Sequence, residues 1–193
     1  SLECLVVDNA SWERESLRQL KGEFPETTLI ENAENLGFAR GSNAGLEVSR
    51  GRHLLLLNPD TSVGEGALDE MVRFLDAHPD VAVLGSPLAY PDGRDQRVAG
   101  RGFPTPLSSI FGRTTLLTRW FPNNRFSRRF SSRRAPSRKE PFETDWVSGA
   151  CMMVRRSAVQ DVGGMDERFF LYFEDVDWCT RMQARGWLVT YVP

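Results

Sequence analysis

The regular alternation of short apolar runs with helix-like segments is the feature that most limits the fold of this chain. The strand-like runs are Leu2–Val7, Thr28–Glu31, His53–Leu57 and Val81–Gly85, and the helix-like segments between them are Trp12–Phe24, Ala39–Ser49 and Glu65–His78. This rhythm predicts an α/β fold in which helices cover both faces of a mostly parallel sheet. A length of 193 residues suffices for one sizeable core, so we predict a single domain over residues 1–193.

Polar clusters follow three of the predicted strands. They are Asp8-Asn9, the segment from Asn35 to Asn43, and Asn58-Pro59-Asp60. One such cluster alone would be ordinary loop chemistry, because turns are built from these residue types. In open α/β sheets, however, ligands bind at the carboxyl ends of the strands, so three clusters at one edge favour a polar small-molecule site.

The stretch Phe169–Met182 carries the strongest candidate for catalysis, Asp175. The residues at helical spacing from Asp175 are Trp178, Cys179 and Met182. One interpretation is an acidic first helical turn packed under aromatic residues. The other is a catalytic base, kept ionised by the helix N-terminus and shielded from water by aromatic side chains. The shielding residues in this second interpretation are Phe170, Tyr172, Phe173 and Trp178.

The composition shifts abruptly over residues 97–142. Ten Arg or Lys residues lie between Arg101 and Lys139, with no acidic residue among them and with aromatic side chains interleaved. One interpretation is a solvated insertion. The other is a basic flap, formed by residues 101–139, that contacts an anionic membrane or a diphosphate-bearing substrate. A net charge of −2 for the whole chain argues against nucleic acid as the partner.

The cysteine pattern and the hydropathy of the chain indicate where in the cell the protein is located. Cys4, Cys151 and Cys179 have neither metal-site nor disulfide spacing and lie in apolar contexts, which predicts reduced core thiols in a cytoplasmic protein. We find neither a signal peptide nor an apolar run of about 18 residues. A cytoplasmic location is therefore expected, with peripheral attachment at the inner face of the plasma membrane as a further possibility.

Five ordered blocks of the sequence resemble family 2 glycosyltransferases, especially the rhamnosyltransferase-like bacterial enzymes that build O-antigen, capsule or cell-wall polysaccharide. The blocks are VVDNAS (6–11), ENLGFARGSNAGL (34–46), LLLLNPD (54–60), SGACMMVRR (148–156) and GGMDERFFLYFEDVDWCTR (163–181). The resemblance covers nearly the whole chain except the basic insertion. It implies a GT-A (Rossmann-like) fold, an inverting transfer from a nucleotide-diphospho-sugar, and Mg²⁺ or Mn²⁺ as cofactor.

The resemblance also implies roles for particular residues. Those implied to bind a dTDP- or UDP-linked donor are Asp8, Asn9, Asn35, Gly37, Phe38, Asn43 and Asp60, of which Asp60 would also hold the metal. Those implied on the sugar and acceptor side are Trp146, Gly149, Glu174 and Trp178. Asp175 would act as the base. Rhamnose or another deoxyhexose as the sugar, and a polysaccharide or lipid-linked acceptor, are hypotheses on the same ground.

Three departures from the family pattern accompany the resemblance. Members usually have a strand and helix before the VVDNAS-like strand, Asn58 replaces the first acid of the usual DxD triplet, and the His that often follows the last strand is missing. They predict a partial domain that lacks the usual first strand and C-terminal part and binds its donor poorly. Two alternatives stay open: a non-catalytic nucleotide-sugar-binding domain, and a membrane-surface or nucleic-acid interaction module driven by residues 101–139.

Overall fold

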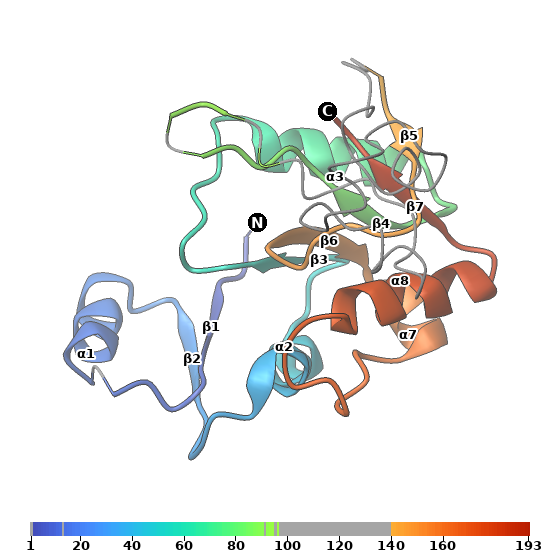
Figure 1. Ribbon diagram of the computed structural model, residues 1–193. Coiled ribbons are helices and arrows are strands. Elements are labelled where there is room, and N and C mark those ends of the chain that lie inside the picture. The colour runs from blue at the N-terminus through green and yellow to red at the C-terminus, as the bar shows by residue number, and fades with distance from the viewer. Residues whose placement is uncertain (1, 13, 91, 95, 97–139) are drawn as a thin grey trace, which may run out of the picture.

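The computed structural model describes residues 2–12, 14–90, 92–94, 96 and 140–193 (Figure 1). In this part of the chain the elements are, in order, β1 (Leu5–Asp8), α1 (Arg14–Glu23), β2 (Thr28–Glu31), α2 (Gly37–Val48), β3 (His53–Leu57), α3 (Ala67–Ala77), β4 (Val81–Gly85), β5 (Phe142–Glu143), β6 (Cys151–Arg155), α7 (Arg156–Val162), α8 (Glu174–Ala184) and β7 (Leu188–Tyr191). The basic insertion predicted over residues 97–142 falls, up to residue 139, outside the described residues, so its role stays a prediction.

The strands form two sheets. β1 and β2 pair in parallel as a two-stranded sheet, and the five-stranded sheet has the order β3-β6-β4-β7-β5. Within the larger sheet β4 and β7 are parallel, whereas β6 runs antiparallel to both β3 and β4, and β5 is antiparallel to β7. The predicted α/β class is confirmed, and the sheet is mixed. An apolar run such as that of β6 does not encode the direction in which a strand enters a sheet.

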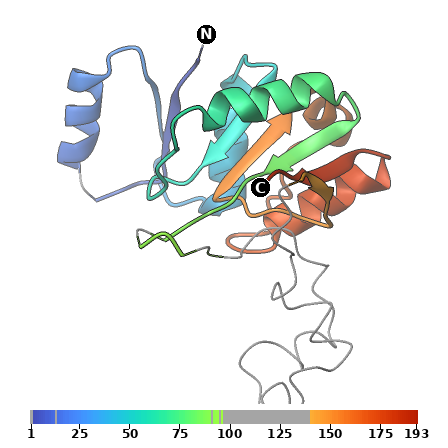
Figure 2. The same cartoon turned by 90° about the horizontal axis from the view of Figure 1, so that it is seen from above.

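Helices cover both faces of the five-stranded sheet, as predicted. α3 lies on one face, and α2, α7 and α8 lie on the other (Figures 1 and 2). β6 serves both faces, because successive side chains of a strand point to opposite sides. Met152 and Val154 belong to the core cluster under α7 and α8, whereas Cys151 and Met153 belong to the cluster under α3.

Arg155 ties the end of β6 to α3. Its guanidinium donates hydrogen bonds to the carbonyl oxygens of Val81, Leu75 and His78. The last two carbonyls lie at the C-terminal end of α3, where the final turn of a helix leaves acceptors without an internal partner. One side chain thus fixes the helix to the sheet.

The cysteine prediction holds for two of the three thiols. Cys151 and Cys179 are buried, but Cys4 is exposed, which corrects the expectation of a core thiol there. The physical reason is that β1 begins at Leu5 and leaves the preceding residues outside the sheet. Among the described residues, we find no helix that is long and apolar enough to cross a membrane.

Candidate active site

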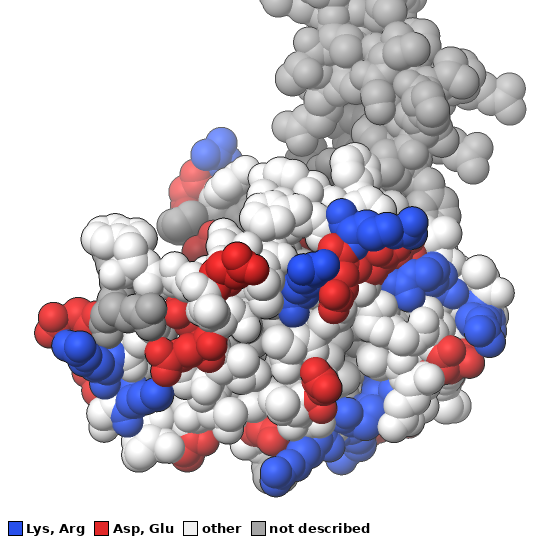
Figure 3. Space-filling model, turned by 90° about the horizontal axis from the view of Figure 1, so that it is seen from below, with Lys and Arg blue, Asp and Glu red and all other residues white. Residues whose placement is uncertain are grey.

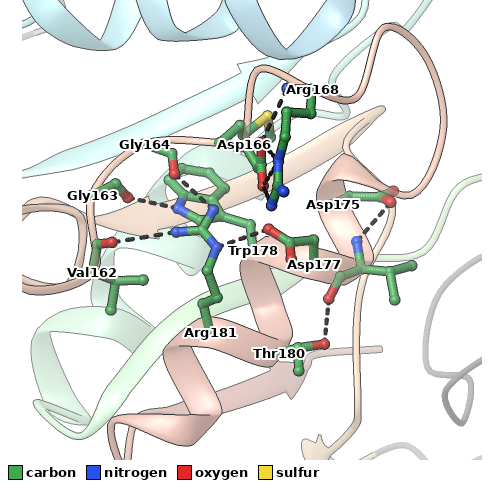
Figure 4. Close-up of polar contacts among 12 residues, drawn as sticks. Val162, Gly163, Gly164, Asp166, Arg168, Asp175, Asp177, Trp178, Thr180 and Arg181 are labelled. Carbon is green, nitrogen blue, oxygen red and sulfur yellow. Dashed lines mark hydrogen bonds and ion pairs between the residues drawn. The ribbon is translucent and has the colours of Figure 1, made fainter.

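Asp175 lies in the first turn of α8, and backbone donors hold its carboxylate in place. The Gly149 N–H donates to Oδ2 at 3.1 Å. The Val176 N–H donates to Oδ1 at 2.8 Å, the contact drawn from Asp175 in Figure 4. Burial is the main influence on the Asp175 carboxyl and raises its pKa, while the backbone N–H groups act in the opposite direction. The result is an oriented carboxylate with a higher proton affinity than an exposed aspartate.

Glu174 adds a second buried carboxyl beside the first. Only 5% of the residue is exposed, and Oε2 has no hydrogen-bond partner among the described residues. Burial raises the pKa of Glu174, and the negative charge of the adjacent Asp175 adds to this effect. Both neighbouring carboxyl groups therefore bind a proton more tightly than exposed ones do.

Two glycines allow α2 to approach the catalytic helix closely. Gly37 has φ +81°, and a Cβ atom there would lie 2.4 Å from the carbonyl oxygen of Phe170. The same carbonyl accepts a hydrogen bond from the Phe38 N–H at 2.8 Å. A Cβ atom on Gly149 would lie 3.1 Å from the Phe38 ring. Gly149, a predicted site residue, therefore contacts both Asp175 and Phe38, while Gly37 packs against Phe170.

Two of the three asparagines predicted to bind the donor, Asn9 and Asn35, meet at Gly37. The side-chain amide of Asn9 donates to the Gly37 carbonyl at 2.9 Å, and its oxygen accepts from the amide of Asn32 at 2.9 Å. Asn35 accepts from the Gly37 N–H at 2.9 Å. These bonds connect the ends of β1 and β2 to the start of α2. Asn32 belongs to this network too, and its position just after a strand is the signal by which sequence reasoning could have included it.

Asp8 lies at the end of β1 with one free oxygen. It is 4% exposed; Oδ1 accepts from the Ser11 N–H at 3.0 Å, whereas Oδ2 has no partner among the described residues. Buried carboxylate oxygens are normally hydrogen-bonded, so an unpaired one is consistent with a group that acquires its partner from a ligand.

Asn43 has a structural task that the sequence does not reveal. Its amide nitrogen donates to the carbonyl of Met165 and to Glu167, and its oxygen accepts from the Met165 N–H. These contacts hold the loop between α7 and α8. In this arrangement the Asn43 side chain positions that loop, and the donor-binding role that the resemblance implies for it stays a prediction.

Side chains of α8 also form hydrogen bonds with the loop between α7 and α8. The indole N–H of Trp178 donates to the Gly163 carbonyl at 2.8 Å, and Arg181 donates to the carbonyls of Val162 and Gly164 (Figure 4). Trp178 is fully buried in the core. The structure therefore gives Trp178 a packing role, and the acceptor-side role implied by the resemblance stays a prediction.

Three of the four aromatic residues expected to shield Asp175 from water are themselves exposed to solvent. Phe170, Tyr172 and Phe173 are exposed, which corrects that expectation; only Trp178 is buried. Tyr172 and Phe173 have φ of 69° and 71°. For bulky residues such left-handed conformations cost of order 1–3 kcal/mol each, and they concentrate at functional sites. Sequence periodicity carries no signal for this strain.

Asp60 and Trp146 take no part in the hydrogen bonds described above. The Asn58 N–H donates to the Ala150 carbonyl at 2.9 Å and so joins the end of β3 to the segment before β6. Asp60 follows it and is exposed, and Trp146 is half-buried against the core. Among the described residues no group of three or more His, Cys, Asp or Glu could hold a metal ion.

Solved structures identify the class of protein that this fold defines. The chain superposes on GalNAc-T7 with UDP, GalNAc and Mn²⁺ at a TM-score of 0.63, with 13% identity, over 99% of this chain and 36% of that one. It superposes on the mannosyltransferase PcManGT from Pyrobaculum calidifontis, in complex with GDP-Man and Mn²⁺, at 0.65 with 20% identity, over 100% and 45%. The fold is therefore that of GT-A glycosyltransferases.

Sequence comparison then specifies the family. Residues 1–163 match the description "Glycosyl transferase family 2", and the chain belongs to this family. It is 31% identical over 200 residues to the N-acetylglucosaminyl-diphospho-decaprenol L-rhamnosyltransferase of Mycobacterium tuberculosis, a match covering 98% of this chain and 63% of that protein. It is 24% identical to the low-salt glycan biosynthesis hexosyltransferase Agl10 of Haloferax volcanii, over 95% and 54%. The family predicted from the sequence is confirmed.

Proposed function

We propose that this chain carries the catalytic region of an inverting glycosyltransferase, which moves a sugar from a nucleotide-diphospho-sugar to a hydroxyl of a lipid-linked glycan. The Asp175 carboxylate carries this proposal. Backbone N–H groups of Gly149 and Val176 orient it. Gly149 in turn packs against Phe38 at the start of α2, where the polar ends of β1 and β2 are bonded. A single displacement needs one correctly placed base, and this carboxylate supplies it.

The proposed reaction is a direct substitution at the anomeric carbon. Asp175 accepts the proton of the acceptor hydroxyl while the acceptor oxygen forms its bond to the anomeric carbon. The bond from that carbon to the diphosphate oxygen breaks, and the diphosphate leaves with the electron pair. Because attack and departure occur on opposite sides, the configuration inverts. Burial, which raises the pKa of Asp175, makes it a better proton acceptor than an exposed aspartate.

The donor end of the proposed site lies at β1 and α2. The unpaired oxygen of Asp8 and the network of Asn9, Asn35 and Gly37 offer both acceptors and donors to a nucleotide. We propose a dTDP- or UDP-linked sugar. The name of the mycobacterial relative, an L-rhamnosyltransferase acting on a diphospho-decaprenol, supports rhamnose and a lipid-linked acceptor. An acceptor of this kind favours action at a membrane surface, to which residues 101–139 would contribute.

Asp60 fits a Mg²⁺ or Mn²⁺ ion in the proposed site. Mg²⁺ in such enzymes is commonly held by one or two carboxylates together with substrate phosphates, and a single exposed carboxylate after β3 meets that need. When bound, the ion would neutralise the charge that builds on the departing diphosphate. Both solved structures named above contain Mn²⁺, which supports this choice.

Calorimetric titration with dTDP, UDP and GDP, with and without Mn²⁺, tests the donor site. We expect one nucleotide to bind in a Mn²⁺-dependent manner, and binding to be lost in Asp60→Asn but retained in Asp69→Asn, which removes a similarly exposed carboxylate from α3. Turnover with a polyprenyl-diphosphate-linked acceptor should then fall by about 10²–10⁴-fold in Asp175→Asn. Full turnover in Asp175→Asn would refute the assignment of the base.

A further inference from the structure

Four consecutive large apolar residues stand exposed just before the catalytic helix. The exposed fractions of Phe170, Leu171, Tyr172 and Phe173 are 57%, 53%, 72% and 54%. We call this segment, residues 170–173, the apolar tip. Single exposed apolar residues are normal on soluble proteins, whereas contiguous ones mark surfaces that meet a partner.

The fold holds the apolar tip in a defined shape. At its start the Phe170 carbonyl accepts the N–H of Phe38, and at its end the Phe173 carbonyl accepts the N–H of Asp177 at 2.9 Å. Asn43 holds the preceding part of the loop by both the N–H and the carbonyl of Met165. Tyr172 and Phe173 also adopt left-handed backbone conformations, which cost free energy locally. The surrounding contacts must therefore hold the segment in this exposed conformation.

The position of the apolar tip relates it to the acceptor. Its last residue is the N-cap of α8, and Asp175 follows two residues later. In the proposed reaction the acceptor hydroxyl must reach Asp175, so whatever binds the tip lies next to the acceptor. Apart from the Tyr172 hydroxyl, the tip side chains have no hydrogen-bonding group, which suits hydrocarbon better than a polar sugar ring.

Two arginines near the apolar tip are paired with acidic side chains. Arg168 forms an ion pair with Asp166, and Arg40 forms one with Glu167 at 3.3 Å. Acidic and basic side chains are also interspersed across the face seen in Figure 3, without a field of one sign. Attachment through the tip would therefore depend on apolar burial and not on anionic lipid.

We propose that the apolar tip inserts between the hydrocarbon chains at a membrane surface and so brings Asp175 to the headgroup of a lipid-linked acceptor. This inference rests on the proposed function for the identity of the acceptor. A tyrosine flanked by phenylalanine and leucine suits the boundary between headgroups and acyl chains, where amphipathic rings accumulate. The tip differs in mechanism from the basic segment 101–139, whose contact would be electrostatic.

Cosedimentation of the full chain with phosphatidylcholine vesicles, without donor or acceptor, tests the insertion. We expect binding that is unchanged between about 0.1 M and about 0.5 M NaCl, since these concentrations screen only electrostatic contacts. The double variant Leu171→Ser/Tyr172→Asn should bind about tenfold less, since two large apolar side chains no longer insert. Asn tolerates the left-handed conformation, so the loop should keep its shape. Trp12→Ser, which removes a side chain that is 86% exposed elsewhere, is the matched control and should bind normally.

Two results would overturn the proposal. One is binding that requires phosphatidylglycerol, disappears at the higher salt concentration and is unaffected in the tip variant, which would assign membrane contact to basic residues. The other concerns turnover of two acceptors, one water-soluble with a short lipid chain and one carried in vesicles. If the tip variant loses turnover equally with both, the apolar tip contacts the glycan and not the membrane. Nucleotide binding by the tip variant should remain normal. If vesicle binding depends on the tip but the protein shows no turnover at all, the proposed function is refuted and the membrane insertion still stands.

Discussion

At the scale of single residues, Asp175 combines partial burial with fixed orientation. Both carboxylate oxygens accept backbone N–H groups, and burial nevertheless dominates and raises the pKa. A base needs to be ionised at the working pH and to bind a proton well in the transition state. Within the part of the chain that the structure describes, no charged side chain pairs with Asp175, so burial and backbone N–H groups set the direction of its pKa shift.

This environment predicts the pH dependence of turnover. We expect kcat/KM to rise with pH through an apparent pKa above the value of about 3.9 typical of exposed aspartate. Below that pKa the carboxyl is protonated and cannot accept the acceptor proton. Rate measurements between about pH 4 and pH 8 check this, with Asp69→Asn as a variant that should keep the profile. An identical acidic limb in the residual activity of Asp175→Asn would contradict the assignment.

The buried Glu174 predicts a second, separate pH effect on stability. Its pKa is raised in the folded state, so the folded protein binds the proton more tightly than the unfolded chain. The stabilisation from neutral Glu174 is complete below the unfolded pKa of about 4.3 and is lost as pH rises to the folded pKa. Glu174→Gln, which stays neutral, should therefore gain stability relative to wild type as pH rises through this window.

Urea unfolding of both proteins at several pH values measures the Glu174 effect. The difference in the free energy of unfolding should be small at low pH and grow towards neutrality. Glu143→Gln, at an exposed position in β5, is the matched control and should show a much smaller trend. A constant difference across the pH range would mean that the Glu174 carboxyl has the same pKa in the folded and unfolded states.

At the scale of elements, the site depends on how closely α2 approaches the loop before α8. Gly37 begins α2 and touches Phe170, and Phe38 fills the space beside Gly149. The donor and acceptor sides of the proposed site are thus connected through one helix start. A change at this contact should affect both stability and turnover.

Gly37→Ala measures the importance of this contact. The new Cβ would add a clash with the Phe170 carbonyl to the cost of a positive φ. Gly66→Ala is the matched control, because Gly66 has φ +75° but no atom within 4 Å of the added Cβ. We expect Gly37→Ala to be less stable than Gly66→Ala by about 1–3 kcal/mol in denaturant unfolding, the usual cost of overpacking. Equal destabilisation would show that only backbone conformation matters at both sites.

At the scale of the whole molecule, the chain divides into regions of unequal burial. The two core clusters lie on either face of the five-stranded sheet. β1, α1 and β2 lie at one end, as Figures 1 and 2 show, and within the described residues none of their side chains belongs to either cluster. The proposed nucleotide site thus includes the least buried end of the protein.

Hydrogen exchange should reveal this division. Amides of β1 and β2 should exchange through openings of lower free energy than amides of β4 and β6, since regions with few buried apolar contacts open first. Addition of the bound nucleotide identified by calorimetry should slow exchange in β1, if Asp8 and Asn9 contact the donor. Equal protection of both sheets without nucleotide would contradict the expected difference.

Local patterns were sufficient to locate many elements and part of the site. The strands Thr28–Glu31, His53–Leu57 and Val81–Gly85 have the predicted bounds, because short apolar runs between turn residues leave few alternatives. Helical periodicity likewise placed Asp175 on the stripe that carries the buried Trp178. The family emerged from motif order, and the comparisons confirm it.

Long-range contacts decided the remaining features. The antiparallel direction of β6 and the exposure of Phe170 and Tyr172 depend on which distant segments pack together, and an apolar side chain has the same sequence signal whether it is covered or not. The bond from Gly149 to Asp175 spans 26 positions in the chain, so no local pattern contains it. The sequence alone therefore determined many of the elements and the family, which follow from local periodicity and motif order. Only the tertiary structure decided how Asp175 is oriented and what surrounds it, because those properties arise from residues that are distant in the chain.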